Sequence, residues 1–242
     1  MSLIYSMRLC LINAEVPLFI GASIRNFLDK NEGLQAVFVR VKLKTNAKFE
    51  DNQDLKGNQM RNVIFAINIT IDGCCDHTKT IADEELLEYY TQLIRDGDLL
   101  VYGRKTYQLM VPYWPDVAKD QSTTKAEKEF ARTFDSINKI VFSRSLDSAE
   151  GNTRIVRTKL QDEILRLKQE QGKNILVGGV DIPSQLIELG LVDEYRFVVQ
   201  PIVAGEGRRL MEGVSLPDKL QLKLVESKPF KSGCVALRYL KQ

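Results

Sequence analysis

The segment Val101-Tyr102-Gly103-Arg104-Lys105-Thr106-Tyr107 is an apolar run that breaks at a glycine and continues into two cations and a hydroxyl. A second run of the same kind follows further along the chain, Ile175-Leu176-Val177-Gly178-Gly179. A short apolar run that ends at glycine is typical of a buried strand whose backbone turns sharply or approaches a ligand closely. The two segments predict an anionic dinucleotide at the carboxyl ends of parallel strands, although two ordinary strand–helix turns would show the same pattern.

Strand and helix patterns alternate on both sides of these segments. Apolar and β-branched runs predict strands at residues 62–71, 98–102, 139–143, 174–177 and 194–203. Apolar residues at helical spacing predict helices at residues 83–95, 124–133, 160–171 and 183–189. Two last strands, 220–227 and 234–240, are joined by a turn near Gly233 into an antiparallel hairpin. This order predicts an α/β fold with a mixed, mostly parallel central sheet and helices on both faces.

Composition excludes several classes of protein. The chain has 242 residues, is 44% hydrophobic and carries a net charge of +2, so it can bury a sizeable core and lacks the cationic excess of a nucleic-acid-binding or membrane-surface protein. No apolar run reaches the length of about 18 residues that a membrane span needs. The four cysteines show no disulfide-dense spacing, which favours a reducing cytoplasm: Cys10, Cys74, Cys75 and Cys234.

Residues 1–59 differ from the rest of the chain. The apolar stretch at residues 9–24 is interrupted by Asn13, Glu15 and Pro17, and residues 42–59 are polar. The first stretch is too broken for a membrane span and lacks the small-residue cleavage site of a secretory signal. The polar stretch is typical of a linker or a disordered tail. We expect a poorly defined extension at residues 1–59, disordered or not native, and a nucleotide-binding domain at residues 60–242.

Seven short motifs between residues 61 and 241 follow one another in the order found in one known family. They are Asn68-Ile69-Thr70-Ile71-Asp72-Gly73, Gly103-Arg104-Lys105-Thr106-Tyr107, Val111-Pro112-Tyr113-Trp114, Val141-Phe142-Ser143-Arg144, Val177-Gly178-Gly179, Gly190-Leu191-Val192-Asp193-Glu194 and Pro201-Ile202-Val203-Ala204-Gly205-Glu206-Gly207. In these motifs the chain resembles the dihydrofolate-reductase-like superfamily. It is most similar to the reductase domain of the riboflavin-biosynthesis deaminase–reductases and its stand-alone relatives. One motif alone is a weak signal, whereas all seven in order are specific.

The resemblance implies a fold, an activity and an assembly. The fold is a three-layer dihydrofolate-reductase-like fold, and the assembly is a homodimer. The activity is NADPH-dependent reduction of a pterin-like or aminopyrimidine-like heterocycle of the folate or riboflavin pathway, as in 5-amino-6-(5-phosphoribosylamino)uracil reductases. A non-catalytic nucleotide-binding or sensor protein of the same fold is the alternative. The deaminase partner of the bifunctional enzymes is excluded, because its zinc motif needs a Pro-Cys-x-x-Cys pair that this sequence lacks.

The resemblance also implies which residues hold NADPH. The family's diphosphate motif matches Gly103–Thr106, and the segment that holds the 2′-phosphate matches Ser143 and Arg144. A guanidinium suits that group, because it pairs with phosphate through two parallel hydrogen bonds. The expected cofactor-binding residues are Ala66, Gly103, Arg104, Lys105, Thr106, Ser143, Arg144, Gly178, Gly179, Val180, Asp181 and Ile182.

The loop after the first strand carries the residues expected at the reaction centre. Relatives place here the loop that closes over nicotinamide and substrate, and Gly73 offers a hinge. His77 is the only histidine of the chain. Histidine as a residue type has an ordinary pKa of about 6.5, which suits a proton donor after hydride transfer. Asp72 is the second catalytic candidate and Asp76 a substrate contact, whereas a solvated loop histidine is the alternative for His77.

Two further features of the sequence have more than one interpretation. Tyr113 and Trp114 stand between two prolines, where they could stack on a flat heterocyclic substrate or anchor a loop on the core. Cys74 and Cys75 precede Asp76 and His77. We expect no metal there, because adjacent cysteines do not readily ligate one tetrahedral ion and no second cluster completes the ligand set.

Overall fold

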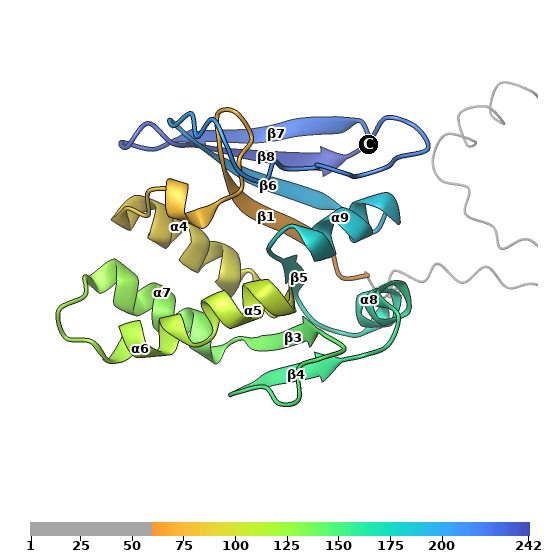
Figure 1. Ribbon diagram of the computed structural model, residues 1–242, viewed down its shortest axis with the longest axis horizontal. Coiled ribbons are helices and arrows are strands. Elements are labelled where there is room, and N and C mark those ends of the chain that lie inside the picture. The colour runs from red at the N-terminus through yellow and green to blue at the C-terminus, as the bar shows by residue number, and fades with distance from the viewer. Residues whose placement is uncertain (1–59) are drawn as a thin grey trace, which may run out of the picture. The chain divides into compact units, whose positions relative to one another are not determined.

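The computed structural model describes residues 60–242, so the predicted extension at residues 1–59 lies outside the described residues (Figure 1). The strands are β1 (Val63–Thr70), β2 (Gly97–Gly103), β3 (Asn138–Phe142), β4 (Thr153–Val156), β5 (Asn174–Val177), β6 (Glu194–Gln200), β7 (Leu222–Pro229) and β8 (Val235–Lys241). They form one sheet in the order β4-β3-β2-β5-β1-β6-β8-β7. The strands from β4 to β6 in this order run parallel, and β8 and β7 form an antiparallel hairpin at one edge. The predicted sheet is confirmed.

Helices cover both faces of the sheet, as predicted (Figure 1). They are α4 (Glu84–Arg95), α5 (Arg104–Met110), α6 (Tyr113–Lys119), α7 (Lys125–Ser136), α8 (Leu160–Gln169), α9 (Asp181–Glu188) and the short 3-10 helix η1 (His77–Lys79). Residues of α8 and α9 share one buried cluster with one face of the sheet, and residues of α4, α5 and α7 share a second cluster with the other face. Between residues 60 and 242, no helix has the length and apolarity that a membrane span requires.

The strand sequences show why the sheet is covered twice. In β1, Val63 and Phe65 belong to the cluster under α8 and α9, whereas Ile64 belongs to the cluster under α4 and α7. A strand buried on both faces has no polar face, so it reads as a continuous apolar run rather than an alternating one. Helix caps fix the neighbouring elements: the carboxylate of Asp83 accepts a hydrogen bond from the Leu86 amide at 2.7 Å, and α7 begins with a capping box of Thr124 and Glu127.

The sheet has a switch point between β2 and β5, where the helix that follows each strand changes from one face to the other. These strands are neighbours, but α5 follows β2 on one face and α9 follows β5 on the other. Tyr107 of α5 packs with α4 and α7, whereas Leu186 of α9 packs with α8. Two helices that diverge in this way leave a crevice at the carboxyl ends of their strands, which is where open α/β sheets bind ligands.

Candidate functional site

A cavity of about 240 Å³ opens at the carboxyl ends of β2 and β5. One wall is the start of α5, with the cations Arg104 and Lys105 and the hydroxyl of Thr106. The opposite wall is the turn after β5 and the start of α9. The lining residues are Gly103, Arg104, Lys105, Thr106, Phe142, Gly178, Val180, Asp181 and Ile182. All of them except Phe142 belong to the cofactor-binding set expected from sequence; Phe142 was missed because an apolar strand residue carries no signal of ligand contact.

The glycines after β5 bring the two walls together. Gly179 has a φ of +84°, and a Cβ at this position would overlap the hydroxyl of Thr106. At Gly178 a Cβ would lie 2.6 Å from Cε1 of Tyr102, which is closer than real side chains approach. The turn therefore lies directly against the end of β2 and the start of α5, and only glycine fits both positions.

The turn after β3 adjoins the cavity through Phe142. The Ser143 hydroxyl oxygen accepts hydrogen bonds from the amides of Ser145 at 3.3 Å and Leu146 at 3.0 Å, so it fixes the turn. Arg104 Nη1 donates to the Ser145 hydroxyl at 3.0 Å, which joins this turn to the start of α5. The exposed guanidinium of Arg144 has no hydrogen-bond or ion-pair partner among residues 60–242. Among the described residues it is an unpaired cation, two positions after the cavity-lining Phe142.

Ala66 lies outside this cavity, on β1. It is partly buried and packs against the cluster under α4 and α7. Two residues along the same strand, the Asn68 side-chain oxygen accepts a hydrogen bond from the Tyr90 hydroxyl of α4 at 2.9 Å. Burial raises the pKa of Tyr90 well above its ordinary value, so this hydroxyl keeps its proton. Sequence reasoning missed this pair, because a tyrosine at a helical apolar spacing reads as core.

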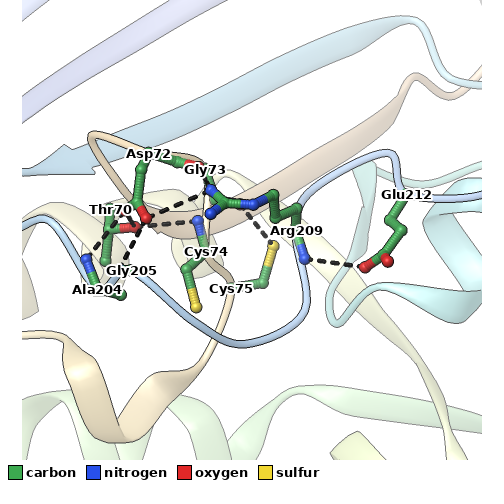
Figure 2. A network of polar contacts seen from close by, with 9 residues as sticks. All are labelled: Thr70, Asp72, Gly73, Cys74, Cys75, Ala204, Gly205, Arg209 and Glu212. Carbon is green, nitrogen blue, oxygen red and sulfur yellow. Dashed lines mark hydrogen bonds and ion pairs between the residues drawn. The ribbon is translucent and has the colours of Figure 1, made fainter.

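Asp72 is the centre of a polar network at the end of β1 (Figure 2). Its carboxylate accepts hydrogen bonds from the Thr70 hydroxyl at 2.6 Å and from the amides of Ala204 and Gly205, each at 3.0 Å. Arg209 adds an ion pair at 3.3 Å and donates to the Asp72 carbonyl. The bond from Thr70, followed by the one from Ala204, lowers the pKa of Asp72 far below its ordinary value. A carboxylate held ionised in this way is not a proton source near neutral pH.

Backbone hydrogen bonds join the same two segments of chain. The Cys75 amide donates to the Arg208 carbonyl at 2.9 Å, and the Leu210 amide donates to the Gly73 carbonyl at 2.8 Å. The Ile71 amide donates to the Ile202 carbonyl at 2.9 Å. We call residues 71–75 and 202–210 together the two-loop clasp. The start of the predicted closing loop is therefore fixed to the segment that follows β6.

The rest of the predicted loop lies beyond the clasp. The Asp76 carboxylate caps η1 by accepting from the Thr78 amide at 2.9 Å, and this bond with the one from the Thr78 hydroxyl lowers the pKa of Asp76. The His77 side chain is 63% exposed, with Nδ1 3.8 Å from Asp76 Oδ1, and it does not line the cavity. Burial raises the pKa of the Cys75 thiol to about 11, so it is no reactive thiolate. Within residues 60–242, no three potential metal ligands are grouped to hold an ion.

Comparison with known proteins places this architecture in a family. A family model described as "RibD C-terminal domain" matches residues 61–236. The chain belongs to this family. The uncharacterized protein YyaP of Bacillus subtilis is 31% identical over 185 residues, which cover 75% of this chain and 95% of that protein. The RibD C-terminal domain family is the one that the sequence motifs indicated, so the resemblance is confirmed.

Solved structures of the same fold extend beyond close relatives. A pyrimidine reductase-like protein from Corynebacterium diphtheriae is 16% identical with a TM-score of 0.53, and the match covers 75% of this chain and 92% of that one. A dihydrofolate reductase from Enterococcus faecalis, solved as a complex with NADP(H), is 12% identical with a TM-score of 0.52, over 75% of this chain and 96% of that one. These likenesses confirm the dihydrofolate-reductase-like fold.

In this member of the RibD C-terminal domain family, the aromatic pair at the start of α6 has two different surroundings. Trp114 packs against Phe130 of α7, with ring centroids 4.4 Å apart, in the buried cluster under α4 and α7. Tyr113 is 59% exposed and meets the Trp114 ring edge-on. The packing of Trp114 favours the second interpretation of the pair, in which it anchors the chain on the core, and leaves Tyr113 as the ring that is free to stack on a ligand.

Proposed function

We propose that this protein is an NADPH-dependent reductase of a pterin-like or aminopyrimidine-like heterocycle, of the 5-amino-6-(5-phosphoribosylamino)uracil reductase type. The observation that carries the proposal is the cavity, whose donor set of Arg104, Lys105 and Thr106 has the charge and the hydroxyl that a diphosphate needs. Membership of the RibD C-terminal domain family and the likeness to a protein named pyrimidine reductase-like support the reaction class. The NADP(H) complex of the dihydrofolate reductase neighbour supports the cofactor.

The residues divide the binding of this cofactor between two places. The start of α5 and the turn at Gly178 and Gly179 bind the diphosphate, because cations and closely approaching backbone face the cavity there. Ser143 and Arg144 bind the 2′-phosphate, where the free guanidinium of Arg144 gives a bidentate partner. NADPH, when bound, supplies the hydride. The protein's part is to orient the cofactor, hold the heterocycle and deliver a proton.

Cofactor choice tests this proposal directly. Replacing Arg144 with alanine removes a charged hydrogen-bond partner of the 2′-phosphate, so NADPH binding should weaken by about 1.5–3 kcal/mol, or roughly 10- to 150-fold. NADH lacks that phosphate, and its binding should be unchanged. Titration of protein fluorescence with each cofactor measures both affinities. Equal weakening of NADH and NADPH would remove Arg144 from the 2′-phosphate site, and a wild-type chain that binds neither cofactor would end the proposal.

His77 is the proton donor that we propose. It is the only histidine, it is exposed, and it follows the clasp directly, so η1 can move over the substrate while residues 71–75 stay fixed. His77→Ala should lower the rate of substrate reduction by about 10²-fold and leave NADPH affinity unchanged. The matched control is Lys79→Ala in the same loop, whose ammonium pairs with Glu206 and not with His77; this variant should keep the wild-type rate. A His77→Ala protein that reduces substrate at the wild-type rate between pH 5 and 8 would exclude this role.

Two other proposals rest on single observations. His77 and Asp76 lie outside the cavity, which favours as the alternative a nucleotide-binding or sensor protein without turnover. Oxidation of NADPH with a panel of pterins and aminopyrimidines separates the two functions.

The homodimer stays a prediction, and strand β7 supports it. This edge strand exposes Leu224 and Val225, and soluble proteins cover such edges, often with a second copy.

A further inference from the structure

The cavity wall contains a carboxylate where an anion is expected to bind. Asp181 is the first residue of α9 and lines the cavity opposite Arg104 and Lys105. A free carboxylate there would repel a diphosphate, because both are anionic and the cavity holds them close together. In the structure this charge is neutralised by Arg208, whose Nη1 donates to Asp181 Oδ1 at 2.6 Å.

Arg208 reaches Asp181 from the two-loop clasp. Its backbone carbonyl accepts the hydrogen bond from Cys75, and the next residue, Arg209, pairs with Asp72. The backbone of Arg208 is therefore fixed, while its side chain extends to the rim of the cavity. The side chains of Arg208 and Asp181 are 46% and 56% exposed. An ion pair this exposed contributes about 0–1 kcal/mol, so the guanidinium can leave the carboxylate at little cost.

We propose that Arg208 is a further cofactor-binding residue. It is held at the rim by Asp181 when the cavity is empty, and it turns to the diphosphate when a dinucleotide binds. The guanidinium fork suits this exchange, because it pairs in the same bidentate manner with a carboxylate and with a phosphate. The inference rests on the proposed function. It adds that the two-loop clasp, which Asp72 holds together, positions Arg208 to bind the cofactor.

The diphosphate is common to NADPH and NADH. Loss of Arg208 should therefore weaken the binding of both cofactors, whereas loss of Arg144 should weaken the binding of NADPH alone. Arg208→Gln should weaken the binding of both cofactors by the same factor, about tenfold, because one charged hydrogen-bond partner is lost. Asp181→Asn should strengthen both by about threefold, since the competing carboxylate is gone. Lys79→Gln is the matched control. It removes a cation that forms an ion pair with Glu206 of the same clasp at 3.9 Å, away from the cavity, and should leave both affinities unchanged.

The experiment measures dissociation constants of NADPH and NADH for wild-type protein and four variants at one ionic strength: the three above and Arg208→Lys. Equal unfolding midpoints without cofactor show that the variants are folded, and Arg208→Lys, which keeps the charge without the fork, should bind with intermediate affinity. An Arg208→Gln protein with wild-type affinity, or with a loss for NADPH alone, overturns the inference while the proposed function stands. A wild-type protein that binds neither cofactor ends the proposed function and this inference with it.

Discussion

Replacing Gly179 with alanine is expected to lower the midpoint of thermal unfolding by roughly 10 °C and to abolish measurable cofactor binding. The added Cβ meets two obstacles. The φ of +84° is strained for any residue with a side chain, and the methyl group would overlap the Thr106 hydroxyl. Each obstacle costs about 1–3 kcal/mol, so the loss of stability should be about 2–6 kcal/mol. Relief of the overlap moves α5 away from α9 and deforms both cavity walls.

Two matched variants separate the cost of the positive φ from the cost of the overlap with Thr106. Gly151 also has a positive φ, +58°, but a Cβ there would meet nothing within 4 Å, so Gly151→Ala should show the backbone cost alone, about 1 kcal/mol. Adding Thr106→Ala to Gly179→Ala removes the overlapping hydroxyl and should recover part of the lost stability. Thermal unfolding by circular dichroism measures all four proteins. If Gly179→Ala and Gly151→Ala lose the same amount, the close approach of α5 and the Gly179 turn is not a source of strain.

The central strands β1, β2, β3 and β5 could be predicted from sequence because helices cover them on both faces. Such strands show continuous apolar runs, and β5 was predicted with the bounds that the structure gives it. Four elements were not predicted because they bury little apolar surface: η1, α5, α6 and β4. Val117 is the only buried residue of α6, and Val156 the only buried residue of β4. Contacts with neighbouring elements determine such elements: β4 pairs with β3, and α6 packs on α7.

The cavity could be predicted for a similar reason, and the clasp could not. Two apolar runs that end at glycine belong to parallel strands, whose carboxyl ends meet at one edge of the sheet, so their flanking residues gather in one place. No comparable pattern in the sequence indicates the hydrogen-bond partners of Asp72. Its partners Ala204 and Gly205 lie more than 130 positions along the chain, and only the folded loop after β6 brings their amides to its carboxylate. In sequence, a carboxylate next to a glycine at a strand end is equally typical of a catalytic group and of a residue that holds two loops together.

Glu194→Gln is expected to destabilise the protein by about 3 kcal/mol, which corresponds to a midpoint roughly 6–12 °C lower for a chain of this size. Glu194 begins β6 and is 4% exposed. Its carboxylate accepts from Arg196 Nε at 2.5 Å and from Arg238 at 2.9 and 3.0 Å. Arg196 and Arg238 stand directly opposite each other on β6 and β8, so loss of the carboxylate leaves two like charges paired across the strands.

The effect of Glu194→Gln should depend on pH in one direction. Burial by itself raises the pKa of Glu194, but hydrogen bonds from Arg238 and Arg196 outweigh it, so the folded pKa lies below the ordinary value. The stability due to the carboxylate is then fully present above the unfolded pKa of about 4.3 and is lost as the pH falls through the folded pKa. Urea unfolding should show a constant gap between wild type and variant above about pH 5 and a shrinking gap below about pH 4. The control is Asp116→Asn, whose side chain is 81% exposed in its pair with Lys119 and should change stability by at most about 0.5 kcal/mol. An equal gap at pH 3 and pH 7 would show that Glu194 acts by packing and not by its charge.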